Sequence, residues 1–231
     1  MLTPKKKIKV SAKDLKKDEL LTFVEKASEW YYANQRNAIV AVVAILAIVG
    51  ALWSYSYHVR SNNERASAEL GKVYSLYDNG QYKEAIEGIP QDTILGLKSL
   101  VENYDGTDAG EIAELYLANA YSMTNDYENA LKHFESCSVS DARLKAAVIA
   151  GIASCNEIKK NYREAAEHYR KAASLSGISV ATPEYLFNAA NNFALCGEKE
   201  TARELYNRLK KEFPQSQQAR DIDRFLAAIA G

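Results

Sequence analysis

The chain has 231 residues, of which 29 are Lys or Arg and 30 are Asp or Glu, so its formal net charge is −1. Its three cysteines are odd in number and lack CxxC spacing, which argues against a full disulfide framework. Helix-forming residues dominate, only four prolines occur, and strand-like alternation is nearly absent, so the composition predicts an all-α protein.

Residues 1–36 form a basic leader. They contain nine Lys or Arg and five Asp or Glu, which gives 9 − 5 = +4. The run from Lys5 to Lys17 is short, is interrupted by acidic residues and stands near an apolar segment, so attraction to anionic lipid explains it more simply than nucleic-acid binding. Ser11 and Asp14 have capping-box spacing before a helical apolar pattern, which predicts a juxtamembrane helix. We therefore expect no nucleic acid among the partners.

Residues 37–57 carry no formal charge, and aromatic residues flank them at residues 30–32 and at Trp53, Tyr55 and Tyr57. A helix of this length rises about 30 Å, the thickness of the hydrocarbon core, and aromatic rings collect at its interfaces. A cleaved secretory signal fits poorly, since a long leader precedes the run and bulky residues stand where a peptidase requires small ones. The segment is therefore predicted to be a single transmembrane helix that contacts membrane lipid.

The charges on the two sides of this helix predict its orientation. The residues outside the leader carry 20 basic and 25 acidic side chains, 20 − 25 = −5, against +4 in the leader. Because Lys and Arg are retained on the cytoplasmic side, the N-terminus should face the cytosol and residues 58–231 the opposite side. In a bacterium this arrangement is a single-pass inner-membrane protein with a periplasmic domain.

Residues 58–231 contain a recurring pattern: a small residue, a large one three positions later, a Tyr-x-x-Ala step, an aromatic residue and a second small residue. The Tyr positions Tyr127 and Tyr162 are 35 residues apart, and Lys199 follows Tyr162 by 37. Since small residues at a crossing let antiparallel helices approach closely, the pattern predicts stacked helical pairs. It occurs four times, in the segments 73–89, 118–137, 153–172 and 190–214, the first of them weaker.

The pattern resembles the tetratricopeptide family over residues 65–215. The resemblance implies an α-α superhelical solenoid of about four repeats. Gly88-Ile-Pro90 breaks the first repeat, and residues 94–104 are expected to add an amphipathic turn or two. Residues 216–230 are predicted to be the C-terminal capping helix, with Ile222, Phe225, Leu226 and Ile229 facing inward.

The span is predicted to continue as a helix into the first repeat. The sequence contains no Gly or Pro between Ala51 and Leu70 that would break a helix at that point. A continuous helix would hold the repeats close to the membrane.

Catalytic motifs are missing from the sequence: it has no Gly-rich phosphate loop, nucleophile elbow or catalytic carboxylate pair. We therefore expect no enzyme activity, no cofactor and no metal. The three histidines also lack metal-binding spacing, and the last two are expected at the surface: His58, His133 and His168. The cysteines are expected to be buried packing thiols, with a bridge between the first two as an open alternative: Cys137, Cys155 and Cys196.

In tetratricopeptide proteins the first helix of each pair lines a concave groove. By that resemblance we expect a protein-binding groove, in which Asn bonds the backbone of an extended peptide and Tyr, Met and Phe contact apolar side chains. The alternative for each residue is packing in the core. The candidates are Leu70, Tyr74 and Tyr77 in the first repeat, Leu115, Asn119, Ser122 and Met123 in the second, Ala150, Ser154 and Glu157 in the third, and Phe187 and Asn191 in the fourth.

Four short segments, together with the order of leader, span and repeats, resemble the YfgM-like family of single-pass proteins, which includes an ancillary subunit of the bacterial Sec translocon. The resemblance implies association with the translocon and with a periplasmic chaperone, to assist exported proteins. Two other functions stay open: an adaptor in outer-membrane or envelope assembly, and a structural subunit of a larger membrane complex. The segments are Gly96-Leu97 to Tyr104-Asp-Gly-Thr107, Ala109-Gly110, Thr182-Pro183 to Tyr185-Leu186, and Phe213-Pro214-Gln-Ser216.

Protease added to spheroplasts is expected to digest the part of the chain beyond Tyr57, because the charge asymmetry places it outside the cytoplasm. Immunoblots with antibodies against each end of the chain measure this, with detergent-permeabilised cells as the control. Cleavage of the leader together with protection of the repeats would reverse the predicted orientation.

Overall fold

The structure is a computed structural model that describes residues 12–230 and the side chains of residues 22–229. The chain divides into two compact units, Met1–His58 and Val59–Gly231. In the first unit, helix α1 extends over Ala12–Ala33 and helix α2 begins at Gln35. The predicted capping box of the leader falls outside this description, because Ser11 precedes residue 12 and the side chain of Asp14 precedes residue 22.

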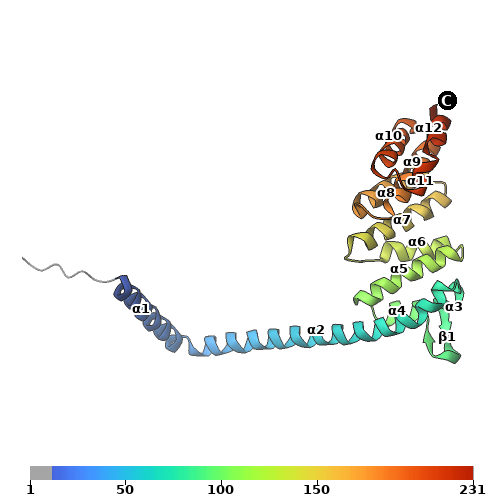
Figure 1. Cartoon of the computed structure of the whole chain (residues 1–231). Coiled ribbons are helices and arrows are strands. Elements are labelled where there is room, and N and C mark those ends of the chain that lie inside the picture. The colour runs from blue at the N-terminus through green and yellow to red at the C-terminus, as the bar shows by residue number, and fades with distance from the viewer. Residues whose placement is uncertain (1–11, 231) are drawn as a thin grey trace, which may run out of the picture. The chain divides into compact units, whose positions relative to one another are not determined.

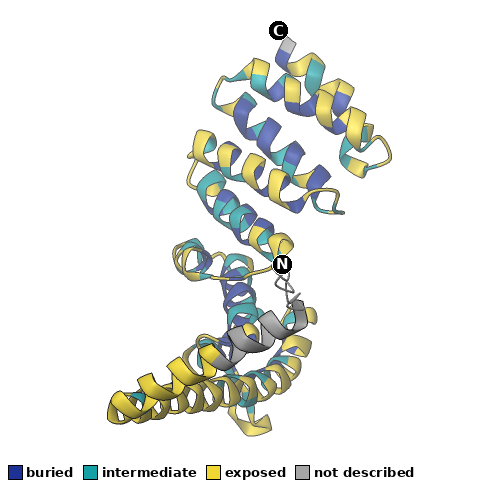
Figure 2. Ribbon diagram, turned by 90° about the vertical axis from the view of Figure 1, so that its left-hand side faces the viewer, coloured by how far each residue is buried: buried dark blue, intermediate teal, exposed yellow. Residues whose placement is uncertain are grey.

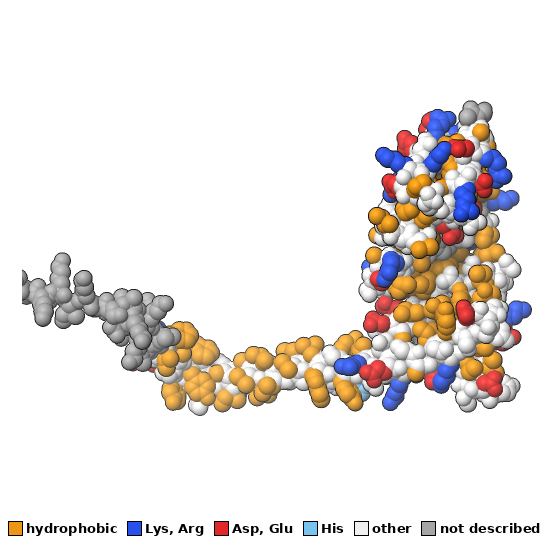
Figure 3. Space-filling model, viewed as in Figure 1, with side chains coloured by type: hydrophobic (Ala, Val, Ile, Leu, Met, Phe, Trp, Pro, Cys, Tyr) orange, Lys and Arg blue, Asp and Glu red, His pale blue; other side chains and the backbone are white. Residues whose placement is uncertain are grey.

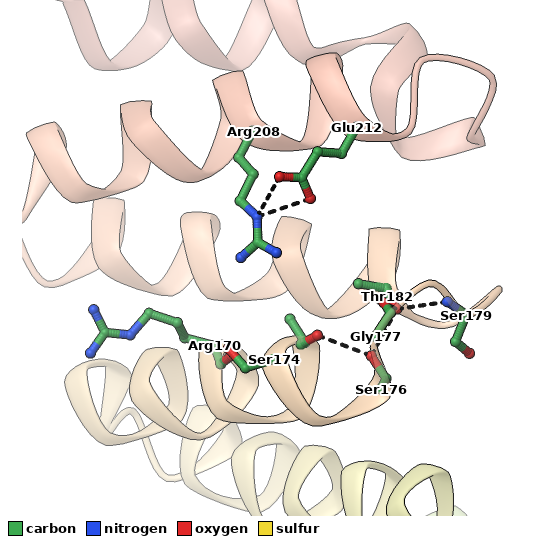
Figure 4. A network of polar contacts seen from close by, with 9 residues as sticks. Arg170, Ser174, Ser176, Gly177, Ser179, Thr182, Arg208 and Glu212 are labelled. Carbon is green, nitrogen blue, oxygen red and sulfur yellow. Dashed lines mark hydrogen bonds and ion pairs between the residues drawn. The ribbon is translucent and has the colours of Figure 1, made fainter.

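Helix α2 extends without interruption from Gln35 to Asp78 (Figure 1). The uncharged residues 37–57 lie in its first half, where the large apolar side chains are exposed (Figure 3). By length and composition this helix can cross a membrane, and none of its most apolar window is buried inside the protein. Among the described residues it is the one helix with this property.

The second unit consists of helix pairs stacked one upon the next (Figure 1). The pairs are α5 (Asp108–Met123) with α6 (Tyr127–Ser136), α7 (Ala142–Ile158) with α8 (Tyr162–Ser176), and α9 (Thr182–Leu195) with α10 (Lys199–Glu212). Small side chains at the crossings allow this close approach, which confirms the predicted helical repeats. The alanines at these positions are fully buried: Ala118, Ala130, Ala153, Ala165, Ala190 and Ala202.

The turns inside the pairs share one backbone conformation. A residue with positive φ lies in each of them: Gly80, Asn125, Lys160 and Gly197. The N–H of the following residue donates to a carbonyl five positions earlier, at Leu76, Tyr121, Asn156 and Phe193, over 2.8–2.9 Å. This is the long hydrogen bond of the Schellman motif that ends a helix. All four repeats therefore turn in the same register, even where the left-handed residue is a lysine.

The first repeat departs from the expected helical pair. Helix α3 (Tyr82–Glu87) is short, and strand β1 (Gly88–Ile89) then pairs antiparallel with β2 (Ile94–Leu95) around the 3-10 turn η1 (Pro90–Asp92). A Cβ on Gly96 would overlap the carbonyl of Ile86, so glycine is what lets this hairpin close. The amphipathic helical turns predicted for residues 94–104 therefore begin at Leu97, as helix α4 (Leu97–Asn103).

A capping helix covers the last face of the stack, as predicted. In α12 (Ile222–Ala230) Ile222 is fully buried, and Phe225 and Leu226 pack against the core of α7–α10. The cap also includes the short helix α11 (Gln217–Arg220), which Ser216 begins by accepting a hydrogen bond from the N–H of Ala219 at 3.2 Å. A separate apolar cluster joins α2–α7, so buried residues run through the whole stack (Figure 2).

Two histidines are less exposed than the sequence predicts. His133 is half-buried, its Nδ1 is 2.9 Å from Oε1 of Glu114, and its ring stacks on Tyr121 at 5.3 Å. His168 is also half-buried.

The three cysteines carry free thiols in the structure, so the alternative bridge between Cys137 and Cys155 is not formed. Cys155 is fully buried, and Cys137 and Cys196 are half-buried. Burial raises the pKa of the Cys137 thiol to about 11, with the nearby Glu114 carboxylate adding to the effect. The Cys137 thiol is therefore protonated and unreactive near neutral pH.

Lys160→Gly is expected to raise the free energy of unfolding by about 1 kcal/mol, because glycine adopts a positive φ without the Cβ clash of an L-residue. Thermal unfolding of the full chain measures the change. Gly197→Ala at the matching turn is the control and should lower the stability by a similar amount. Equal melting temperatures for both variants and the parent would contradict the shared turn conformation.

Candidate binding groove

A groove lies between the second half of α2 and the first half of α5. It has a volume of about 500 Å³ and lies wholly within the second unit. On α2 its residues recur at intervals of three, four and seven, which places them on one helical face. The residues lining this α2–α5 groove are Asn63, Ser67, Leu70, Gly71 and Tyr74 on α2, and Asp108, Ala109, Ile112 and Tyr116 on α5.

Asn63 joins the two helices at one end of the groove. Its Oδ1 accepts a hydrogen bond from the N–H of Ala109 at 2.8 Å. This N–H belongs to the first turn of α5, where backbone donors have no partner within the helix. Thr107 caps the same turn by accepting from the N–H of Gly110 at 3.0 Å. The start of α5 is therefore held partly by a side chain of α2.

Tyrosine rings join the helices further along. Tyr116 lies edge-on to Tyr74 and Tyr77, with ring centroids 5.5 and 4.9 Å apart, and Tyr77 lies edge-on to Tyr82 at 5.4 Å. Burial, helped by the neighbouring tyrosines, raises the pKa of Tyr77 to about 12. Burial also raises the pKa of Tyr116. Tyr77 and Tyr116 are thus neutral near neutral pH, and the four rings together form an apolar wall.

Gly71 leaves the middle of the groove open. A Cβ built on Gly71 would meet no atom within 4 Å. The groove is deep at this point because glycine has no side chain to fill it. Leu70 and Ile112 are half-buried, and Tyr74 is 43% exposed. The groove therefore presents apolar surface that a ligand can reach.

The candidates of the second repeat divide between core and surface. Leu115 is 7% exposed and belongs to the core, so it does not line an open surface. The side chain of Asn119 donates to the carbonyl of Leu115 at 2.9 Å, within its own helix. Ser122 is half-buried, and Met123 is 58% exposed at the end of α5.

The candidates of the third repeat are mostly engaged with α8. Ala150 is buried in the core and does not face an open groove. Ser154 and Glu157 are half-buried and lie close enough to the hydroxyl of Tyr169 to affect its pKa. Burial, with the nearby Glu157 carboxylate, raises the pKa of Tyr169. These side chains therefore help to fix α7 against α8.

In the fourth repeat both candidates contact the C-terminal helices. Asn191 accepts a hydrogen bond from the hydroxyl of Tyr206 at 2.6 Å. The ring of Phe187 lies edge-on to that of Phe225, with centroids 4.9 Å apart, and lines a second hollow of about 310 Å³ beside Arg224. This hollow is separate from the α2–α5 groove.

Seven of the nine residues that line the α2–α5 groove were not among the sequence candidates. Spacing from Leu70 and Tyr74 by one or two helical turns could have identified those on α2. Those on α5 precede the repeat pattern by one to three turns, so the pattern does not mark them. The seven are Asn63, Ser67, Gly71, Asp108, Ala109, Ile112 and Tyr116, of which Ala109 contributes its backbone N–H.

The groove offers groups that suit binding. It contains amide, hydroxyl and carboxylate side chains beside aliphatic and aromatic ones, which together suit hydrogen bonds, ion pairs and apolar contacts with a polypeptide. In the part of the chain that the structure describes, no group of three or more His, Cys, Asp or Glu side chains is arranged to hold a metal ion.

Comparisons with known proteins agree with this fold. A family model described as a tetratricopeptide repeat-like domain matches residues 28–220. Among solved structures, a protein described as a kinesin light chain from Podosopora anserina with nearly identical TPR-like repeats superposes with a TM-score of 0.56. The two chains are 15% identical, and the match covers 72% of this chain and 85% of the other, so the likeness shows the fold alone. A search of curated proteins gives no match.

Tyr77→Phe is expected to remove a tyrosinate absorbance step centred near pH 12 from the folded protein, because burial raises the pKa of Tyr77 to about 12. In denaturant, the tyrosinate absorbance step that Tyr77→Phe removes should centre near the ordinary tyrosine pKa of about 10. The pKa of Tyr77 is higher in the folded chain than in the unfolded chain. The contribution of neutral Tyr77 to the free energy of unfolding is therefore complete below about pH 10, and it is lost as the pH rises through about 12. A step near pH 10 in the folded protein would contradict the buried tyrosine cluster.

Proposed function

This chain belongs to the tetratricopeptide repeat-like domain family, and from that premise we propose that it is a membrane-anchored scaffold that binds segments of other proteins. Stacked helix pairs of this kind form extended surfaces for protein partners. The observation that carries the proposal is the α2–α5 groove, whose apolar middle remains accessible and whose end at Asn63 and Asp108 carries hydrogen-bonding and charged groups.

The proposed anchor is the segment 37–57. It lies in the first half of α2, where the apolar side chains have no protein cover. With +4 charges in residues 1–36 and −5 in the remainder, the proposal places the leader in the cytosol and residues 58–231 in the periplasm of a bacterium.

The proposed partners are the Sec translocon and a periplasmic chaperone, with exported proteins as clients. The resemblance of four segments to the YfgM-like family supports this choice. Two of these segments build the start of α5: Thr107 caps the helix, Ala109 donates to Asn63, and a Cβ on Gly110 would overlap the carbonyl of Tyr104. The family-like residues therefore shape one end of the α2–α5 groove.

A second candidate function is an adaptor in outer-membrane or envelope assembly. The hollow beside Phe187 and Phe225, about 310 Å³ in volume, favours it, because it lies at the end of the repeats that Phe213-Pro214-Gln-Ser216 terminates. A third is a structural subunit of a larger membrane complex, which would use the same surfaces for one permanent partner.

Photo-crosslinking in intact cells tests these functions. A benzophenone amino acid placed at Tyr74, which is exposed in the α2–α5 groove, is expected to capture protein partners. The matched control is Lys132, which is exposed on α6, outside that groove. Mass spectrometry then identifies the captured proteins.

The identity of the products separates the three functions. Translocon and chaperone subunits support the proposal, outer-membrane assembly factors support the second function, and one stoichiometric partner supports the third. Equal capture at Tyr74 and Lys132 would contradict the groove as the binding surface.

A further inference from the structure

We propose that the α2–α5 groove selects extended peptide segments in which apolar residues lie between two basic ones. The apolar side chains lie over Gly71, between Leu70 and Ile112. The basic side chains pair with Asp108 at one end and with Asp78 at the other. This inference rests on the proposed function, because it names the chemistry of the segment that the scaffold binds.

The groove carries negative charge and no positive charge among its lining residues. Asp108 is the one ionised side chain of the nine that line it. Asp78 lies four residues beyond Tyr74, on the same face of α2, and is close enough to Tyr116 to raise the pKa of that tyrosine. Near Asp108, burial and the carboxylates of Asp108 and Asp105 raise the pKa of Glu111, against a smaller opposing effect of Lys145. Both ends of the groove are therefore acidic.

Neither of the two aspartates has a charged partner within the part of the chain that the structure describes. None of the ion pairs found there uses Asp78 or Asp108. The nearest lysine along α2, Lys72, is bound to Oε1 of Glu69 at 2.7 Å. The two carboxylates are thus free to pair with cations of a ligand.

The position of Asp78 argues for a role outside folding. It is the last residue of α2, where the helix dipole disfavours a negative charge. Asp108, in contrast, stands in the first turn of α5, where the dipole favours it. Removing the charge of Asp78 should therefore leave the fold intact, which makes it the cleaner site for a test.

The length of the groove sets the length of the ligand. Asn63, beside the start of α5, and Asp78 are fifteen positions apart on α2, or about 22 Å along the axis. An extended peptide covers this distance with about seven residues. Between its ends, the rings of Tyr74 and Tyr116, which line the groove, can also contact basic side chains through cation–π interactions.

The probe is a capped seven-residue peptide with Lys at both ends and Leu and Phe in the middle, labelled for fluorescence anisotropy. Its controls replace both Lys by Ser, or both by Glu. Binding is measured on the full chain in a nonionic detergent, at low and high salt. The variants are Asp78→Asn, Asp108→Asn and Gly71→Leu, the last of which fills the open middle of the groove without a clash at its Cβ.

The Lys peptide is expected to bind most tightly, the Ser peptide more weakly and the Glu peptide most weakly. Each Asp→Asn change should weaken binding of the Lys peptide by about two- to fivefold, and leave the Ser peptide unchanged. Gly71→Leu should weaken both by at least about tenfold. It should keep or raise the melting temperature, because leucine favours the helix more than glycine.

Three results would overturn this account, and each contradicts a different part of it. If the three peptides bind equally and only Gly71→Leu weakens them, the preference for basic segments is wrong and the scaffold function stands. If no peptide binds and Tyr74 captures no protein in cells, the proposed function itself fails. If Asp78→Asn and Asp108→Asn both leave binding of the Lys peptide unchanged, the two carboxylates do not form the basic-residue sites.

Discussion

The close approach of paired helices at buried alanines is the constraint on which the rest of this structure depends. Ala118, Ala153 and Ala190 are fully buried at their crossings. Each pair then turns at a residue with positive φ in the equivalent position, followed by the same kind of long hydrogen bond. Since these contacts repeat along the chain, each pair fixes the position of the next. A larger side chain at such a crossing would cost about 1 to 3 kcal/mol and would disturb the neighbouring pairs.

The α2–α5 groove exists because this constraint is relaxed at one place. Here tyrosine rings lie between the helices, with Tyr116 edge-on to Tyr74 and Tyr77. At the opposite end of the groove, the side chain of Asn63 is joined to the start of α5 by a single hydrogen bond. Between Asn63 and the tyrosine rings, Gly71 has no side chain, so the groove stays open there. The same stacking that closes the core elsewhere therefore opens a surface at the first repeat, where a ligand can complete the packing.

Local sequence predicts the repeats well and the groove only in part. The alanine positions and the capping residue Ile222 follow from periodicity, because a buried crossing must repeat with the helices. The short hairpin at Gly88 and Gly96 depends on a close contact between two backbones, and the contact of His133 with Glu114 depends on how two helices meet. The family pattern marks Leu70 and Tyr74, yet the roles of Gly71 and Tyr116 follow only from the distance between α2 and α5, which is a tertiary property.

Hydrogen exchange of the full chain in a nonionic detergent tests the central claim most directly. It compares the free chain with its complex with the protein that co-purifies from gently solubilised membranes. The account predicts slower exchange in residues 63–78 and 108–116 of the complex, because these segments form the α2–α5 groove. Slower exchange confined to α6, α8 and α10, with residues 63–78 and 108–116 unchanged, would contradict it and place the binding surface on the other helices of the stack.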